Sequence, residues 1–297
     1  MSYGMLIDTT RCIGCRACQV ACKAAHDLPA EKTGFFTKAG GCQNPPALSA
    51  KNYCVVTYSE LPTNDGETQW IFAKRQCMHC NEPACASACP VTALHKTPEG
   101  PVIYDSKKCM GCRYCVWACP FGVPTADWDS LAPEIHKCTL CYERMTASAA
   151  VTEINDKPQT AQARQTYAAS RRLPDCAKAC PTGALKFGDR DQLLAEARKR
   201  IKASPGKYVN HIYGEKEAGG TAQLYLAAVP FEKLGFRADI GNHSYPAVSA
   251  MALKAVSPAV IGLGGLLTGI YLLNRRKEEV ARKAREEKQG KEDANEP

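Results

Sequence analysis

The chain has 297 residues, of which 45% are hydrophobic and only 7% are aromatic. This length allows one large domain or two modest ones, and so few aromatic side chains leave a thin core that bound metal can help to stabilise. The net charge of +8 is spread along the chain without a long basic run. It favours membrane orientation and partner docking, and with no zinc-finger or nucleic-acid motif beside it we expect no nucleic-acid partner.

The N-terminal stretch MSYGMLIDTTRC reaches its first cysteine within a dozen residues. Because a secretory signal needs a charged region, an apolar region and a cleavage site, we expect no signal peptide here. Four short β-prone runs flank the cysteine-rich parts of the chain, with Thr97–Gly100 as the turn of a hairpin. These runs are residues 4–8, 70–75, 101–105 and 183–188.

The clearest soluble helix is predicted over Asp191–Ala203, where apolar residues recur at helical spacing and an Asp opens the segment. Its apolar face is formed by Leu194, Ala197 and Ile201. The stretch Met145–Ser170 is rich in Ala, Thr, Gln and Ser and is interpreted as an insertion, part loop and part helix.

A second long apolar segment, Ala255–Leu273, contains no charged residue. It is long enough at helical rise to cross a bilayer, and its prolines and glycines are better tolerated in membranes than in a buried soluble helix, which is the alternative. Basic residues cluster after the segment and only Lys254 precedes it closely. The positive-inside bias therefore predicts a cytoplasmic tail over 275–297, with everything before the segment on the far side.

Sixteen of the 18 cysteines fall into four groups of four. Most neighbouring cysteines within a group are separated by only two or three residues, which is too close for disulfide geometry and favours metal ligation. The exceptions are Cys80 and Cys85, with four residues between them, and Cys141 and Cys176, with 34. Cys42 and Cys54 stand outside the groups and are interpreted as ordinary thiols. The groups are Cys12, Cys15, Cys18, Cys22; Cys77, Cys80, Cys85, Cys89; Cys109, Cys112, Cys115, Cys119; and the split group Cys138, Cys141, Cys176, Cys180.

The spacing of the third group, C-x2-C-x2-C-x3-C-P, is typical of bacterial two-cluster ferredoxins, in which the last cysteine binds the other cluster. Pairing the second group with the third, and the first with the fourth, predicts four 4Fe-4S clusters. Zinc, the alternative, favours separated C-x2-C pairs. His79 and His136 are expected to pack or hydrogen bond, because cysteine fills every position. The predicted ligand sets are Cys12, Cys15, Cys18, Cys180; Cys22, Cys138, Cys141, Cys176; Cys77, Cys80, Cys85, Cys119; and Cys89, Cys109, Cys112, Cys115.

The predicted fold class is α+β, with two bacterial ferredoxin-like 2x(4Fe-4S) modules and one C-terminal transmembrane helix. The cluster domain is expected over 1–240, with an inner module at about 70–125 and an outer module from 5–30 and 131–190. A linker and the membrane helix follow over 241–274. A cluster ligated by four cysteines has no open position for substrate, and no nucleophile, flavin or dinucleotide motif accompanies the cysteines. We therefore expect no catalytic residue and a role in moving single electrons.

Five stretches carry a family resemblance in their order along the chain: LIDTTRCIGCRACQVAC, RQCMHCNEPACASACPVTAL, KKCMGCRYCVWACPFGVP, HKCTLCYERM and CAKACPTGALKFGDRDQLL. Together they resemble the four-cluster iron-sulfur subunit of molybdopterin oxidoreductases. The stretch VNHIYGEKEAGGTAQLYLAAVPFEKLGF and the single C-terminal span look most like the beta subunit of respiratory formate dehydrogenase. The resemblance covers roughly Met5 to Arg276.

The resemblance implies an electron-transfer subunit of a membrane-bound formate dehydrogenase. Such a subunit takes electrons from a molybdenum or tungsten pterin subunit and passes them through four clusters to a cytochrome b or other quinone-reactive membrane subunit. It also implies a single-pass protein of the bacterial inner membrane with its clusters on the periplasmic side. The iron-sulfur subunit of an uptake hydrogenase, or of another molybdopterin oxidoreductase, is the alternative. A free polyferredoxin and a non-redox iron-sulfur module are two further classes.

Overall fold

The computed structural model describes residues 2–32, 34, 43–63, 65–128, 130, 133–146 and 173–293. Residues up to Pro246 form one compact unit, and Ala247–Pro297 form a second. The expected insertion over Met145–Ser170 lies almost wholly outside the described residues, as does Cys42.

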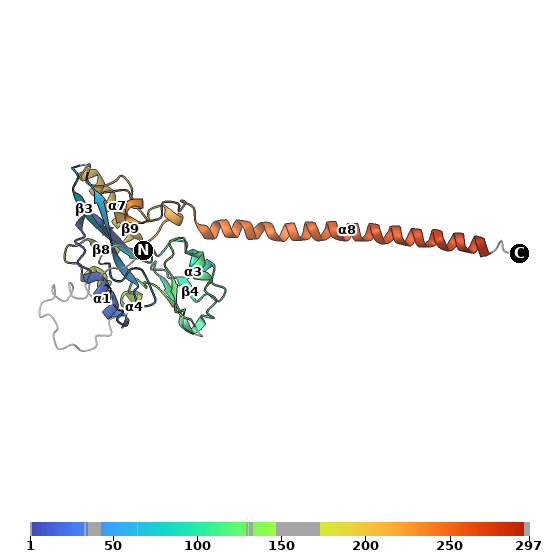
Figure 1. Ribbon diagram of the computed structural model, residues 1–297, viewed down its shortest axis with the longest axis horizontal. Coiled ribbons are helices and arrows are strands. Elements are labelled where there is room, and N and C mark those ends of the chain that lie inside the picture. Colours follow the sequence, from blue (N-terminus) through green and yellow to red (C-terminus); the bar gives the residue numbers. More distant parts are fainter. Residues whose placement is uncertain are drawn as a thin grey trace. The chain divides into compact units, whose positions relative to one another are not determined.

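A three-stranded sheet of order β8-β1-β9 joins the beginning of the chain to its later part (Figure 1). Strand β1 (Tyr3–Asp8) pairs antiparallel with β8 (Leu185–Asp189) and parallel with β9 (Gln223–Leu226). Alternate side chains of β1 enter two different cores, as period-two geometry requires. Met5 and Ile7 pack toward the cysteine-rich core, whereas Leu6 packs beneath helix α7 (Arg190–Ala203).

Helix α7 (Arg190–Ala203) confirms the predicted soluble helix. It begins one residue earlier than expected, because the side chain of Asp189 accepts hydrogen bonds from the N–H groups of Asp191 and Gln192, each at 3.1 Å. Leu193 and Ala197 bury its inner face against the sheet.

Three two-stranded ribbons complete the strand structure of the described residues. Strands β2 (Cys54–Pro62) and β3 (Thr68–Gln76) form the longest ribbon. The predicted hairpin is also present, since β4 (Leu94–Lys96) and β5 (Val102–Tyr104) flank the turn Thr97–Gly100. The remaining ribbon pairs β6 (Thr125–Ala126) with β7 (Ile135–His136).

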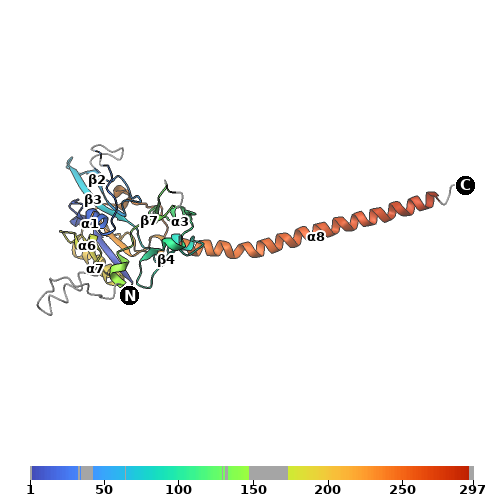
Figure 2. The same ribbon diagram turned by 90° about the horizontal axis from the view of Figure 1, so that it is seen from below.

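Short helices carry the cysteines that follow each loop, and Figure 2 shows α1 beside α6. The helices that contain cysteines are α1 (Ala17–Ala25), α2 (Ala84–Ser87), α3 (Tyr114–Ala118) and α6 (Asp175–Lys178), whereas α4 (Tyr142–Thr146) directly follows Cys141 and contains none. Four 3-10 turns connect the elements: η1 (Thr9–Arg11), η2 (Ser106–Lys108), η3 (Glu217–Gly219) and η4 (Phe231–Leu234).

The cysteine groups form two kinds of local structure, and each kind occurs twice. In the first and third groups an Asp caps a 3-10 turn, Asp8 before η1 and Asp105 before η2, and the cysteine loop then leads into α1 or α3. In the second and fourth groups Pro83 or Pro174 precedes a four-residue helix that holds a buried cysteine, Cys85 or Cys176. Each predicted pair, the first group with the fourth and the second with the third, therefore combines one structure of each kind.

The second unit is helical, with α8 running from Tyr245 to Asp293. This helix contains the stretch Ala255–Leu273, for which the sequence predicts a membrane span. That expectation is not confirmed, because no helix within the described part of the chain combines the length and the apolar character that crossing a bilayer requires.

Candidate metal centre

Each of the four cysteine groups begins with a C-x2-C loop whose second intervening residue adopts a left-handed backbone conformation. Gly14 and Gly111 have φ of 68° and 74°, and the non-glycine residues His79 and Leu140 have φ of 48° and 57°. This turn directs the peptide N–H back toward the first cysteine. The N–H of Gly111 donates to Cys109 Sγ at 3.4 Å, and that of Leu140 donates to Cys138 Sγ at 3.3 Å.

Site I, as named here, comprises Cys12, Cys15, Cys18 and Cys180, which line one cavity. Burial raises the pKa of the Cys12 thiol, and the neighbouring Cys180 and Cys15 thiols raise it further. Burial also acts to raise the pKa of Cys180, but nearby peptide N–H groups and the Thr182 hydroxyl lower it overall. The structure thus brings the beginning of the chain and Cys180 to one cavity.

Site II comprises Cys22, Cys138, Cys141 and Cys176, all of them buried. Burial raises the pKa of Cys138 and of Cys141, and in both cases the Cys176 thiol adds to the increase. A hydrogen bond with Cys54, together with burial, raises the pKa of Cys22, and Cys138 acts on it in the same direction. Cys141 and Cys176 are therefore close together in the structure, although 34 residues separate them in the sequence.

Site III comprises Cys77, Cys80, Cys85 and Cys119, and burial raises the pKa of Cys80 while the other three thiols raise it further. Site IV comprises Cys89, Cys109, Cys112 and Cys115, which line a second cavity. The N–H of Ala93 donates to Cys89 Sγ at 3.2 Å.

The four sites lie next to one another in the order I, II, III, IV. Besides burial, Cys176 of site II raises the pKa of Cys18 in site I, and Cys77 of site III raises that of Cys138 in site II. Cys85 of site III packs in one cluster with Cys115 of site IV. Among the cysteines that the structure describes, the exposed ones are Cys15 in site I and Cys112 in site IV. Sites II and III are therefore interior, and sites I and IV open to the surface.

Two residues near the sites were not singled out as functional by sequence reasoning. Cys54, at the start of β2, is buried, and its thiol donates to the carbonyl of Cys18 at 3.5 Å. Lys74, in β3, is also buried and lines site I. Neither lies in a cysteine motif, and only the pairing of β2 with β3 places them beside the sites.

The histidines hydrogen bond, as expected. His79 is fully buried, and its Nδ1 accepts the N–H of Val102 at 2.9 Å. Burial lowers the pKa of His79 well below its usual range, and nearby lysine charges lower it further. His136 contacts the Tyr53 hydroxyl at 3.2 Å through Nδ1.

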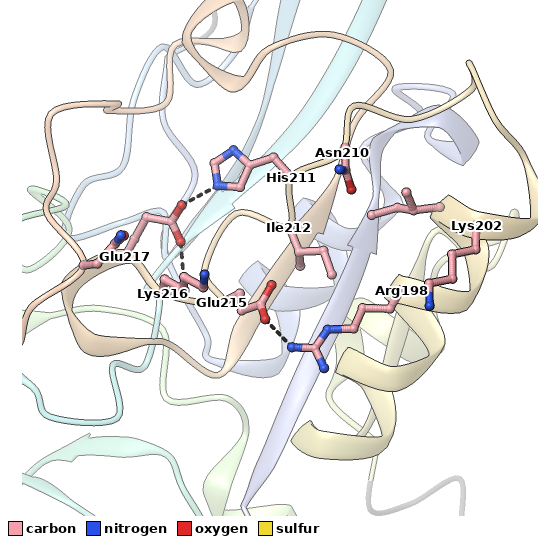
Figure 3. A pocket seen from close by; sticks show the side chains of 10 residues that line it. Arg198, Lys202, Asn210, His211, Ile212, Glu215, Lys216 and Glu217 are labelled. Carbon is pink, nitrogen blue, oxygen red and sulfur yellow. Dashed lines mark hydrogen bonds and ion pairs between the residues drawn. The ribbon is translucent and has the colours of Figure 1, made fainter.

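A surface cavity of about 430 Å³ lies beside helix α7 and contains no cysteine (Figure 3). Its charged side chains are largely paired with each other. His211 Nε2 and Glu217 Oε1 are 2.7 Å apart, and Arg198 pairs with Glu215. Glu217 also accepts the N–H of Gly214 at 2.7 Å. These pairs and hydrogen bonds hold the segment around residues 210–217 in place. The cavity is separate from the cysteine sites.

The residues present at the four sites fit iron-sulfur clusters. Every site supplies four thiols, peptide N–H groups approach several of them, and the ammonium of Lys74 is buried beside sites I and II without a hydrogen-bond partner among the described residues. Four cysteine thiolates hold a 4Fe-4S cluster, and hydrogen bonds to sulfur and the charge around the site are among the features that set its potential. No group of three or more His, Cys, Asp or Glu side chains in the described ranges is arranged to hold a single metal ion.

Comparison with known families agrees with this geometry. A 4Fe-4S dicluster domain matches residues 68–162, and a 4Fe-4S binding domain matches residues 3–24. The fold and its thiol sites thus define an iron-sulfur electron-transfer protein.

Curated relatives extend the similarity over most of the chain. A protein of Nitratidesulfovibrio vulgaris is 42% identical over 282 residues, 94% of this chain and 69% of the relative. The hydrogenase-2 operon protein HybA of Escherichia coli is 36% identical, over 78% of this chain and 72% of HybA. The iron-sulfur subunit of the nitrate-inducible formate dehydrogenase of Escherichia coli is 34% identical, over 74% of this chain and 66% of that subunit. The chain belongs to the family of iron-sulfur proteins that includes HybA and the formate dehydrogenase iron-sulfur subunits.

The loop conformation of site I leads to a prediction for Gly14. A Cβ at this position would lie 2.6 Å from the Phe72 ring, and φ is 68°. We expect Gly14→Ala to add this clash to the cost of about 1–2 kcal/mol for a non-glycine residue in the left-handed region. Gly122→Ala is the matched control, because φ is 62° there but no atom lies within 4 Å of the added carbon. Denaturant unfolding of the iron-loaded protein compares the two, and equal losses of stability would refute the role of Phe72.

Proposed function

We propose that the protein is the electron-transfer subunit of a membrane-bound respiratory formate dehydrogenase. In this proposal it relays electrons from a molybdenum or tungsten pterin catalytic subunit to a cytochrome b or other quinone-reactive membrane subunit. The observation that carries the proposal is the order of the four thiol sites, with two buried sites between two that reach the surface. A row of carriers with two exposed ends suits transfer between two different partners.

The ligands in this proposal are the cysteines of sites I to IV, with one 4Fe-4S cluster at each site. Bound clusters would supply single-electron carriers whose potentials depend on burial, hydrogen bonds to sulfur and nearby charge. The chain itself provides the other features that electron transfer through these sites requires. Its loops hold the thiols together, peptide N–H groups stabilise the thiolates, and the core around Met5, Leu140 and Tyr225 excludes water between the sites.

Apolar side chains surround the exposed thiols at both ends of the row. Ile13 and Val20 are 61% and 68% exposed near site I. Four large side chains near Cys112 of site IV are more than half exposed, and together they are named the site IV patch. The site IV patch consists of Met110, Tyr114, Trp117 and Trp128. Exposed apolar side chains that gather in one part of the surface are typical of protein contacts, and these belong to the part of the chain that holds the exposed Cys112, where a redox partner has to approach.

A second candidate is the iron-sulfur subunit of an uptake hydrogenase. It is favoured by HybA, whose match is 36% identical and covers 78% of this chain, slightly more than the match to the formate dehydrogenase subunit. The two candidates differ in the catalytic partner, which receives the substrate, and they share the same row of sites.

Anaerobic purification through a tag on this chain tests the proposal, with mass spectrometry of the accompanying subunits and metal analysis. A pterin subunit with molybdenum or tungsten supports formate dehydrogenase, and formate-dependent reduction of a dye by the complex identifies the substrate. A nickel subunit instead supports the hydrogenase. Recovery of the chain alone, with its iron, contradicts both.

We propose the bacterial inner membrane as the location, with the cluster-binding unit on the periplasmic side. The support comes from the sequence alone, in the basic residues of the tail, 275–297. Fractionation before the same purification, followed by protease treatment of spheroplasts, tests it. Recovery in the soluble cytoplasmic fraction would contradict this location.

A further inference from the structure

Lys74 is a buried cation between two of the cysteine sites. It lies in β3 opposite Val56 of β2, near the base of the long ribbon, and its exposed fraction is 2%. Its side chain lines the cavity of site I together with Cys12 and Cys18. Its charge also acts on site II, since the Cys176 and Cys138 thiols are among the groups that raise the pKa of Lys74 against the effect of burial.

The surroundings of Lys74 contain thiols where a carboxylate would be expected. The ionisable groups that act most strongly on it are Cys176, Cys54, Cys18 and Cys138, and no Asp or Glu among the described residues is one of them. Its Nζ has no hydrogen-bond partner in the described structure. A buried charge is strongly unfavourable unless an opposite charge compensates it. The compensating charge therefore has to come from these thiols, of which Cys18 belongs to site I and Cys176 and Cys138 belong to site II.

The other lysines near the sites are held differently. Lys96 donates to the carbonyl of Cys80 at 2.7 Å, and Lys137 donates to the carbonyl of Cys138 at 3.0 Å. Both ammonium groups are therefore satisfied by backbone oxygens. Lys178 lies between Cys176 and Cys180 in sequence, close to the same two sites as Lys74, but its side chain is exposed to solvent.

We infer that Lys74 is a shared counter-charge for the clusters at sites I and II and holds both at a higher reduction potential. A 4Fe-4S cluster with four thiolates is anionic and becomes more negative when it accepts an electron, so a nearby fixed positive charge favours the reduced form. The charge acts through a dry core, where water screens it little. Lys74 is a positioning residue for electron transfer, because it sets the energies of two adjacent carriers without binding an electron itself. This inference rests on the proposed cluster ligands of sites I and II.

The test is a potentiometric titration followed by electron paramagnetic resonance, on the complex purified without oxygen. Signals of sites I and II are first identified as those lost in Cys18→Ser and Cys176→Ser. We expect Lys74→Met to shift both clusters toward the oxidised form by at least tenfold in the reduction equilibrium, which is about 59 mV for one electron. Lys74→Arg keeps the charge and should keep both potentials. Lys178→Met removes an exposed charge near the same sites and should shift neither, because solvent screens it.

Each outcome of this experiment either supports or overturns the inference about Lys74. Unchanged potentials in a fully loaded Lys74→Met complex overturn the inference while leaving the relay intact. If Lys74→Met and Lys74→Gln both lose iron from sites I and II and Lys74→Arg retains it, the charge is required for assembly, which supports the inference. Loss of iron in all three variants, or an equal shift in Lys178→Met, overturns it. A wild-type chain without clusters at sites I and II instead refutes the proposed function.

Discussion

Cys138→Ser is expected to stop electron transfer through the complex while leaving the chemistry of the catalytic partner in place. Cys138 belongs to interior site II, and its thiol is influenced by Cys176 of the same site and by Cys77 of site III. Removing this ligand removes the carrier between sites I and III, and electron tunnelling falls steeply with distance. Substrate-dependent quinone reduction should fall to background, whereas reduction of a soluble dye at the catalytic subunit should persist. Iron analysis should show the loss of one four-iron cluster.

Cys54→Ser is the matched control for this experiment. Cys54 is buried and forms a hydrogen bond with Cys22, a ligand of site II like Cys138. Cys54 itself is not among the sixteen proposed ligands. The variant should keep the full iron content and most of the quinone reduction. If Cys138→Ser also kept its iron and rate, Cys138 would not be a ligand, and a loss of iron in Cys54→Ser would require a different ligand set for site II.

Trp117→Lys is expected to weaken binding of the redox partner that contacts site IV. Trp117 is 83% exposed and lies in α3, five residues after the exposed Cys112. A tryptophan at the centre of a contact typically contributes 2 kcal/mol or more, which corresponds to roughly a thirty-fold increase in Kd. One partner subunit should then be lost on dilution during purification, while iron content stays normal. Mass spectrometry of the purified complex measures this loss.

Trp70→Lys provides the comparison, because Trp70 is 62% exposed in the ribbon of β2 and β3, outside the site IV patch. It makes the same change in charge and apolar area at a different surface and should leave both partners bound. Equal losses from the two variants would show that general destabilisation, and not a contact at the site IV patch, explains the result.

The sequence predicted those parts of the fold that local spacing determines. Helix α7 follows from the apolar period of its inner face and a nearby Asp, and the hairpin around Thr97–Gly100 follows from its turn residues. Strand β9 was missed, because all four of its residues are buried and it shows no alternation. Its strand character comes from parallel pairing with β1, more than 200 residues earlier, which no local pattern reports.

In the candidate site, too, local spacing predicts some features, whereas others depend on pairing between distant residues. The cysteine spacings predict the thiols that share one loop, because a C-x2-C loop can turn in only a few ways around a common centre, whereas the four ligand sets as a whole stay a prediction. The positions of Cys54 and Lys74 depend on the register of β2 against β3, in which Cys54 pairs with Gln76 and Lys74 with Val56. A buried lysine in an alternating strand looks like a solvent-facing residue until that register is known.

The position of β1 between β8 and β9 also determines when the fold of this protein can be completed. The first strand of the chain pairs with residues 185–189 and 223–226, so its ladder is incomplete until those residues leave the ribosome. At about 5–20 residues per second, that delay is on the order of ten seconds or more. Throughout this time Met5, Leu6 and Ile7, which become fully buried, are exposed and open to wrong pairing. The nascent chain thus needs protection at its N-terminus during synthesis, and its fold is completed only after most of the protein has been made.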